Sequence, residues 1–148
     1  MKVKIKKLVP EAVIPAYAKL GDAGMDLTAV NYEYKYDIDC HVYGTGLAIE
    51  IPEGFVGFVF PRSSNRKTNA YMCNHVGVID SGYRGEVMVS FKSRDVQHDA
   101  IPQLTAPYSI GNKVAQLIIL PYPKIEFEEV EELSDSERGT GGHGSTGC

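Results

Sequence analysis

The stretch Val76-Gly-Val-Ile-Asp-Ser-Gly-Tyr-Arg-Gly-Glu86 decides the fold, because an apolar run in it ends at a carboxylate and a turn. The β-branched residues before Asp80 favour a short strand, and the glycines after it favour a tight turn. The next run, at 86–91, is again apolar and favours a second strand. We therefore predict a β-hairpin with Asp80 and Tyr83 at its tip. A carboxylate at a strand end can orient a water, although an Asp-Ser-Gly sequence is most often only a turn.

The same pattern of short apolar runs separated by turn residues continues along most of the chain. Polar and apolar residues alternate at 2–8 and 46–51, and short apolar runs occupy 55–60 and 115–120. Fifteen glycines and eight prolines supply the turns between them. This pattern predicts an all-β fold, a jelly-roll-like sandwich or barrel of short strands. One short helix is expected over 64–72, with Ser63 or Ser64 as its N-cap.

The length of 148 residues predicts one domain, followed here by a tail of different composition. We expect a β domain over 1–127, an acidic linker over 128–137 and a glycine-rich C-terminal arm over 138–148. The arm contains five glycines and no apolar run, so it cannot build a core and should be flexible on its own.

Charge and hydropathy exclude some function classes. The net charge of −4 provides no general attraction to nucleic acid, so no direct nucleic-acid binding is expected. No apolar run approaches the length that spans a bilayer, and no signal peptide is apparent, so we expect a cytoplasmic protein without membrane contact. The cysteines at positions 40, 73 and 148 lack metal-like spacing and are expected to be free thiols.

Two further stretches carry chemistry. Pro61-Arg-Ser-Ser64 follows a strand and precedes the expected helix, an arrangement that offers backbone N–H groups and a guanidinium to phosphate. A capped helix with solvated basic residues explains it equally well. Arg138-Gly-Thr-Gly-Gly-His-Gly-Ser-Thr-Gly147 has one cation, one ring and three hydroxyls on a pliable backbone. Such tails are most often linkers, but this one could order over a nucleotide and exclude water.

Five stretches, in order, resemble the motifs of the dUTPase family. They are Gly21-Asp-Ala-Gly-Met-Asp-Leu27, Pro61-Arg-Ser-Ser64, the run from Asn74 to Glu86, Gly111-Asn-Lys-Val-Ala-Gln-Leu117 and the tail from Arg138. One such match would be weak evidence. Five in order and at the right spacing cover nearly the whole chain and make chance agreement negligible.

The resemblance implies a homotrimeric dUTP diphosphatase that uses Mg²⁺ and hydrolyses dUTP to dUMP and pyrophosphate. Such an enzyme limits uracil incorporation into DNA and supplies dUMP for dTMP synthesis. Asp80 would activate the water that attacks the α-phosphorus. Asp26 would touch Mg²⁺ through water, because the phosphates and waters hold most of that ion. The three sites would each be shared between subunits, with the arm reaching over from another copy.

The resemblance also assigns the binding residues. Tyr83 would lie against the deoxyribose and leave no room for a 2′-hydroxyl, and Asn74 would read the uracil edge. The phosphate contacts implied are Arg62, Ser63, Ser64, Gln116, Arg138, Ser145 and Thr146. The nucleoside contacts implied are Asn74, Gly77, Val78, Ile79, Tyr83, Met88 and His143.

Some features depart from the family pattern. Ser64 stands where glycine is usual, His143 where a stacking phenylalanine is usual, and Asn112-Lys113 where Glu-Arg is usual. Residues 92–110 form a longer connection than usual. Tolerated loop length explains it, and a partner-binding loop, as in some phage dUTPases, is the alternative.

Two other functions compete with this interpretation. One is dCTP deaminase, an enzyme of the same fold, against which the Tyr83 motif and the intact arm argue. The other is a regulatory dUTPase-like protein that binds a repressor, which the long connection and His143 leave open.

Overall fold

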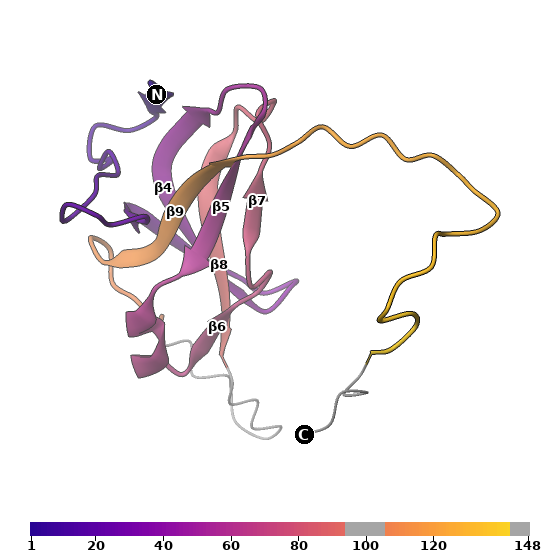
Figure 1. The fold of residues 1–148 in the computed structure, drawn as a ribbon. Coiled ribbons are helices and arrows are strands. Elements are labelled where there is room, and N and C mark those ends of the chain that lie inside the picture. The colour runs from indigo at the N-terminus through magenta and orange to yellow at the C-terminus, as the bar shows by residue number, and fades with distance from the viewer. Residues whose placement is uncertain (94–105, 143–148) are drawn as a thin grey trace, which may run out of the picture.

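The computed structural model describes residues 1–93 and 106–142, and in these it is built almost entirely of strands (Figure 1). The fold class predicted from the sequence is therefore confirmed. Its only helical element in the described residues is a short 3₁₀-helix, η1 (Ser63–Lys67). The strands are β1 (Lys4–Lys7), β2 (Met25–Thr28), β3 (Asn31–Lys35), β4 (Cys40–Glu50), β5 (Phe55–Pro61), β6 (Ala70–Met72), β7 (Gly77–Ile79), β8 (Glu86–Ser93) and β9 (Lys113–Pro121).

The strands form two antiparallel sheets that enclose the core between them. One sheet has the order β1-β4-β8-β6, with β3 also paired to β4, and the other has the order β2-β9-β5-β7. Side chains alternate along β8, so that Val87, Val89 and Phe91 are buried while Met88 is 55 % exposed. Leu27 and Leu117 meet them from the second sheet. The alternation explains how one strand serves both the core and an outer surface.

The predicted hairpin around Asp80 is wrong. Strand β7 pairs with β5, whereas β8 pairs with β4 and β6, so residues 80–85 connect one sheet to the other. A strand–turn–strand pattern predicts two strands and a reversal, but it does not specify which neighbour each strand pairs with. Here the open edge of β5 accepts β7, with Gly57 opposite Ile79. The turn therefore lies where the two sheets meet.

The predicted helix is also corrected. The helical turn covers only Ser63–Lys67, its N-cap is Arg62 without a side-chain cap hydrogen bond, and Ala70–Met72 form β6. The Thr68 N–H donates to the Asn65 carbonyl and closes the turn. Ala70 and Met72 are buried in the sheet, which stabilises an extended backbone there. A run with buried residues at every second position is a strand and not a helix.

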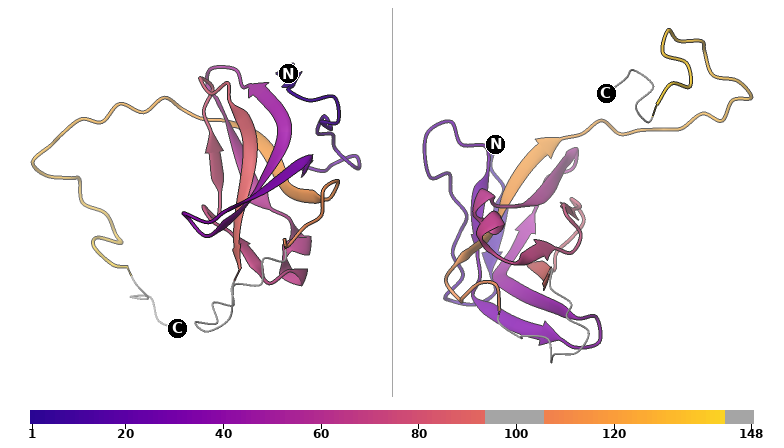
Figure 2. Two further views of the ribbon diagram at one scale, coloured as in Figure 1. Left: turned by 180° about the vertical axis from the view of Figure 1, so that it is seen from behind. Right: turned by 90° about the horizontal axis from the view of Figure 1, so that it is seen from below.

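The chain leaves the β domain after β9. The Tyr122 N–H still donates to the Gly54 carbonyl at 3.0 Å, and beyond it residues 123–140 are exposed. Figures 1 and 2 show this segment running away from both sheets in every view. Phe127 is 94 % exposed and Leu133 is 87 % exposed, so the segment buries little apolar surface within its own chain. The division into linker and arm stays a prediction.

In the described ranges 1–93 and 106–142, no helix has the length and apolar character that crossing a membrane requires.

Candidate active site

A pocket of about 460 Å³ opens where β7 and β8 approach each other from the two sheets. The predicted catalytic residue and six predicted nucleoside contacts all line it. They are Asp80, Asn74, Gly77, Val78, Ile79, Tyr83 and Met88. The structure therefore brings together residues that the sequence analysis had assigned to one task.

The pocket walls are apolar but incompletely covered. Val78 is 61 % exposed, Met88 55 % and Tyr83 42 %. Asp80 and Asn74 are also exposed and add polar groups to the same pocket. A concave surface with apolar walls and a few convergent polar groups is typical of a small-molecule site. A flat ring with a polar edge matches this combination.

The turn from Asp80 to Gly85 is held in shape by its own hydrogen bonds. The Tyr83 N–H donates to the Asp80 carbonyl at 3.1 Å, and the Tyr83 hydroxyl donates to the Glu86 carbonyl at 3.0 Å. Arg84 Nη1 donates to the Ser81 carbonyl at 2.6 Å and to the Tyr83 carbonyl at 2.8 Å. These bonds fix the directions in which Asp80 and Tyr83 leave the backbone.

Two glycines allow close packing around this turn. A Cβ on Gly85 would collide with the Tyr83 ring, reaching its hydroxyl, Cζ and Cε2 atoms. A Cβ on Gly77 would lie 3.3 Å from both Val59 Cβ and Asn74 Nδ2. Glycine at each position lets a pocket side chain pack directly on the backbone. The two glycines therefore help to set where Tyr83 and Asn74 stand.

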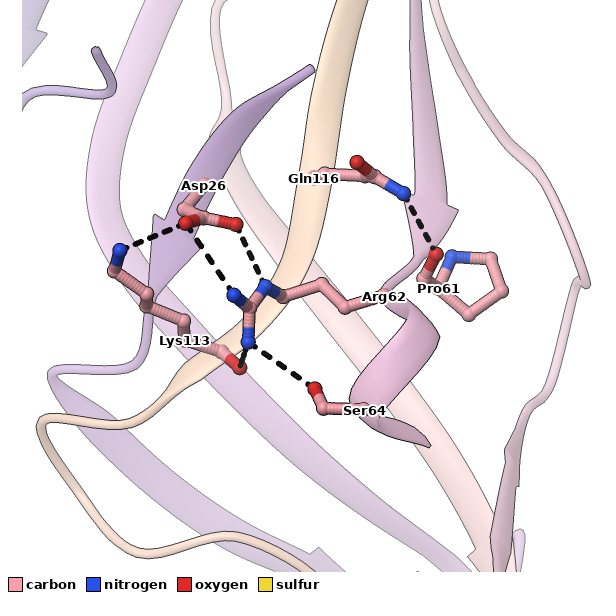
Figure 3. Close-up of polar contacts among 6 residues, drawn as sticks. All are labelled: Asp26, Pro61, Arg62, Ser64, Lys113 and Gln116. Carbon is pink, nitrogen blue, oxygen red and sulfur yellow. Dashed lines mark hydrogen bonds and ion pairs between the residues drawn. The ribbon is translucent and has the colours of Figure 1, made fainter. Parts of the chain in front are cut away.

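A second group of polar residues surrounds the Asp26 carboxylate (Figure 3). Arg62 Nε donates to Asp26 Oδ1 at 2.6 Å, and Lys113 Nζ lies 2.8 Å from Asp26 Oδ2. Arg62 Nη1 also donates to Ser64 Oγ at 3.1 Å. The Asp26 and Arg62 side chains are only 22 % and 28 % exposed, so their ion pair is partly shielded from water. We call Asp26, Arg62, Ser64 and Lys113 the Asp26 cluster.

The cluster keeps Asp26 ionised. Burial raises the pKa of this carboxyl, but hydrogen bonds and charge interactions with Lys113 and Arg62 outweigh burial and leave the pKa below its ordinary value. One carboxylate thus partly neutralises two cations and orients the Arg62 guanidinium. The remaining positive charge makes the cluster suitable for an anion such as phosphate.

Gln116 and Ser63 lie beside the cluster. Gln116 is the cross-strand partner of Asp26, and its Nε2 donates to the Pro61 carbonyl at 3.0 Å. A Cβ on Gly24 would lie 2.5 Å from Gln116 Oε1, so glycine there leaves room for the amide. Ser63 begins η1 and is exposed. The predicted phosphate contacts of the second and fourth motifs therefore gather at one place.

Strand register separates this cluster from the Asp80 pocket within one chain. Ile79 is paired with Gly57, and Arg62 lies five residues further along β5 and its end. At about 3.3 Å per residue this separation is roughly 16 Å. Because β7 runs antiparallel to β5, Asp80 continues away from Arg62. One chain therefore places its candidate catalytic carboxylate and its cation cluster in two separate regions.

Arg138, the one predicted tail contact among the described residues, joins neither region. Arg138 is exposed, its Nε donates to the Gly141 carbonyl at 2.9 Å, and Figure 1 shows the surrounding segment far from both sheets. His143, Ser145 and Thr146 lie outside the described residues, as do positions 94–105 of the long connection. Their predicted roles stay predictions.

Several residues of the site were not predicted from the sequence. Lys113 was noted only as part of a departure from the usual Glu-Arg, yet it binds Asp26, and the basic residue usual at this motif position was the available signal. Ile38, Cys40 and Cys73 line the Asp80 pocket although they belong to no motif. Ile38 and Cys40 are distant in sequence from the pocket's other residues, so only the pairing of β4 with β8 reveals them.

Metal ligands are sparse in the part of the chain that the structure describes. Within residues 1–93 and 106–142, no three His, Cys, Asp or Glu side chains gather in a way that could hold a metal ion. Both oxygens of Asp26 already contact cationic nitrogens. This carboxylate is therefore suited to contact a hydrated ion through water rather than to bind it directly.

Two sheets, a pocket with apolar walls and a carboxylate, and a separate cation cluster are features expected of one class, all-β proteins that bind a phosphorylated nucleoside. The sequence profile of the dUTPase family matches residues 10–147, which is nearly the whole chain. The chain belongs to the dUTPase family.

Individual relatives agree with this assignment. The deoxyuridine 5′-triphosphate nucleotidohydrolase of Cutibacterium acnes is 41 % identical over 145 residues, covering 94 % of this chain and 88 % of the relative. A mutant dUTPase of Staphylococcus bacteriophage 80alpha with dUpNHpp is 27 % identical, with a TM-score of 0.83 and 99 % coverage of both chains. A mutant dUTPase from phage phi11 of S. aureus, described with a structural Mg(II) ion, is 25 % identical, with a TM-score of 0.73 and coverage of 89 % of this chain and 98 % of the other.

Proposed function

We propose that the chain hydrolyses dUTP to dUMP and pyrophosphate, the reaction of the family to which it belongs, by attack of a water on the α-phosphorus. The observation that carries this proposal is the gathering of Asp80 and six of the seven predicted nucleoside contacts around one pocket. In metabolism this activity limits uracil incorporation into DNA and supplies dUMP for dTMP synthesis. The cytoplasmic location expected from the sequence is part of the same proposal.

Asp80 is the general base that orients and activates the water. Its side chain stands on a turn that is fixed by the Tyr83 and Arg84 hydrogen bonds, so the carboxylate is positioned before substrate arrives. Transfer of a phosphoryl group needs little covalent help from the protein, and correct placement of water and phosphate lowers most of the barrier.

The pocket selects the nucleoside. Val78 and Met88 offer apolar surface to the pyrimidine ring, and Asn74 offers its amide to the uracil edge. A cytosine amino group would leave site groups unpaired, which costs more than a lost apolar contact. Tyr83 lies against the deoxyribose and excludes a 2′-hydroxyl. These roles follow from the family resemblance together with the positions of the side chains.

The Asp26 cluster and Gln116 bind the triphosphate. Arg62 supplies a guanidinium already oriented by Asp26, and the Ser64 hydroxyl adds a further hydrogen-bonding group. Arg138, Ser145 and Thr146 complete the phosphate contacts when the arm closes, and His143 stacks on the uracil. Closure of this kind strengthens every charge interaction by removing water.

Mg²⁺ belongs to the proposal as a partner of the triphosphate. The phosphate oxygens and waters would hold it, with Asp26 in contact through water, which fits a carboxylate already engaged by two cations. When bound, it would neutralise charge on the phosphates and on the departing pyrophosphate.

The complete site is shared between copies of the chain in a homotrimer. In one chain about 16 Å of strand separates the level of Ile79 from Arg62, and Asp80 continues in the opposite direction. A second copy can bring its own Asp26 cluster to the Asp80 pocket. The exposed segment after β9, with Phe127 and Leu133 uncovered, suits a crossover to a neighbouring copy. Sedimentation that shows a fully active monomer would contradict this assembly.

The reaction is tested by pyrophosphate release from dUTP, dCTP and dTTP, with and without Mg²⁺. We expect rapid pyrophosphate release from dUTP but not from dCTP or dTTP, and we expect this release to depend strongly on Mg²⁺. Ammonia release from dCTP would instead identify the deaminase of the same fold.

A protein partner for the 92–110 connection remains a separate proposal. Positions 94–105 lie outside the described residues, so the support is the length of the connection alone. Shortening it should spare dUTP hydrolysis if it serves only a partner, and loss of hydrolysis would assign it to the enzyme itself.

A further inference from the structure

Two thiols that the proposed mechanism does not use lie in contact beside the nucleoside pocket. Cys40 begins β4 and Cys73 follows β6, the strands that flank β8 on either side. Their sulfur atoms are 2.9 Å apart, and both residues line the pocket that contains Asp80. The chain folds these residues together from positions 33 apart in the sequence.

We propose that Cys40 and Cys73 are a modification site, which a peroxide oxidises to a disulfide in the pocket wall, and that this disulfide weakens nucleotide binding. The disulfide itself depends only on the two thiols. Its effect on binding rests on the proposed function, because Asn74, the proposed reader of the uracil edge, follows Cys73 directly in the chain.

The geometry requires little movement to form the bond. A disulfide joins two sulfurs at about 2.05 Å, so the pair would have to approach by roughly a further 0.9 Å. Cys40 is only 2 % exposed, whereas Cys73 is less buried and is the thiol that a small oxidant reaches first. Small size and polarity favour hydrogen peroxide as the oxidant that enters the pocket.

The chemistry balances with one peroxide. The Cys73 sulfur attacks a peroxide oxygen, the O–O bond breaks, and a sulfenic acid and one water form. The Cys40 sulfur then attacks the Cys73 sulfur, the S–S bond forms, and the S–O bond breaks. The departing hydroxide takes the remaining thiol proton and leaves as a second water. Two thiols and hydrogen peroxide thus give one disulfide and two waters.

The Cys73 thiol is protected from oxidation at neutral pH. Burial, and next the hydrogen bond with Cys40, raise the pKa of Cys73 to about 12, so the reactive thiolate is scarce. Oxidation should therefore need millimolar rather than trace peroxide and should accelerate as the pH rises. Ordinary function would proceed with both thiols reduced.

The disulfide would pull Cys73 toward β4 and move the backbone that carries Asn74. The Cys73 N–H donates to the Ser90 carbonyl at 2.9 Å, and Ser90 also lines the pocket, so the wall would shift as a unit. Because Asn74 follows Cys73 directly, part of the roughly 0.9 Å closure would reach it, and a misplacement of about 1 Å can lower a reaction rate by up to about a hundredfold. We expect dUpNHpp to bind at least about tenfold more weakly to the oxidised protein.

The test uses the full chain with Cys148→Ser, which leaves only the two thiols in question. Hydrogen peroxide should remove two hydrogen atoms from the intact mass and produce a tryptic product that links residues 36–62 to residues 68–84. Titration calorimetry with dUpNHpp should show the weaker binding after oxidation and full recovery after dithiothreitol. Cys40→Ser and Cys73→Ser should yield no linked product and no loss of affinity that dithiothreitol reverses.

Each other result overturns part of the proposal. Absence of the linked product, with both thiols still reduced or oxidised singly, would refute the modification site. A linked product with unchanged dUpNHpp affinity would refute the coupling to binding. If the reduced protein failed to bind dUpNHpp at all, the proposed function and the coupling would fall together, while the linked product would still decide the chemistry of the thiol pair.

Discussion

At the scale of single residues, two carboxylates of the site stand in opposite environments. Asp26 is held between Arg62 and Lys113, which keep its pKa low and its oxygens engaged. Asp80 is exposed in the wall of the nucleoside pocket, and within the described residues no cation forms an ion pair with it. A carboxylate with free oxygens can take a proton from water, whereas one bound by cations orients those cations. In the proposed mechanism Asp80 is therefore the base, and Asp26 holds the cations in place.

Replacing Asp80 by asparagine should preserve the shape of the turn but remove the base. We expect turnover of dUTP to fall by at least about 10²-fold, while dUpNHpp affinity changes little. Pyrophosphate release and calorimetry measure the two quantities separately. The matched control is Glu53→Gln, an exposed carboxylate outside this pocket, which should leave turnover unchanged. Equal turnover in Asp80→Asn and the native chain would refute the assigned role.

Replacing Asp26 by asparagine should destabilise the protein, because Arg62 and Lys113 would then face each other without their shared anion. We expect a loss of about 1–3 kcal/mol at neutral pH, measured by urea unfolding at fixed protein concentration. Since the folded-state pKa is lowered, this stabilisation is complete well above the unfolded pKa of about 3.8 and disappears as the pH falls through the folded value.

The pH series provides the check on that prediction. The difference in stability between the native chain and Asp26→Asn should shrink when unfolding is measured near about pH 3. Glu50 is the control, because it pairs with Lys4 at 2.9 Å on the exposed surface, and Glu50→Gln should have no measurable effect. A difference for Asp26→Asn that grew on acidification would show that its partners do not lower its pKa.

At the scale of elements, the turn at 80–85 determines the position of the Tyr83 ring, which we propose lies against the deoxyribose. The Tyr83 ring packs directly on Gly85, where an added Cβ would collide with it. A Cβ added at Gly82 would meet no atom within 4 Å. Gly85→Ala should therefore push the Tyr83 ring from its place. We expect discrimination between dUTP and UTP to fall by about tenfold, measured as the ratio of kcat/KM values.

Gly82→Ala is the matched control for that experiment because it adds the same methyl group to the same turn in open space. It should retain the native discrimination. If Gly85→Ala retained it as well, the ring contact would have no part in excluding the 2′-hydroxyl.

The elements also show what the sequence could and could not predict. The apolar runs at 55–60, 86–91 and 115–120 are strands, because alternation and β-branched residues depend on local patterning alone. The pairing of β7 with β5 depends on which sheet edge is open, and no local pattern encodes it. The same limit explains the missed residues. Cys40 and Ile38 reach the pocket only through the pairing of β4 with β8.

The motifs correctly predicted a shared location for residues that are close together in the sequence. Asn74, Asp80 and Tyr83 lie within ten residues of one another and share a pocket, as the third motif implied. Asp26 lies in β2, Gln116 lies in β9 and Arg62 directly follows β5, and the pairing of these strands in one sheet places them together (Figure 3). Lys113 is an example of a contact that the sequence does not predict, because its ion pair with Asp26 depends on the register of β2 against β9.

At the scale of the whole molecule, the two regions of the site lie too far apart in one chain to act on the same phosphate. The register of β5 and β7 separates them, and the segment after β9 leaves the domain with its apolar side chains uncovered. Both features support the proposed assembly, in which neighbouring copies complete one another. Activity should accordingly depend on the oligomer and not on the folded chain alone.

Mixing two inactive variants tests this account most directly. Asp80→Asn retains an intact Arg62, and Arg62→Ala retains an intact Asp80. If each site takes these residues from different copies, equal mixtures refolded or co-expressed together should recover about a quarter of native pyrophosphate release, since both positions are intact by chance at that frequency. The separate variants mixed without exchange should stay inactive. Mixed assemblies that recover no activity would contradict the shared site and place Asp80 and Arg62 of one chain at the same phosphate.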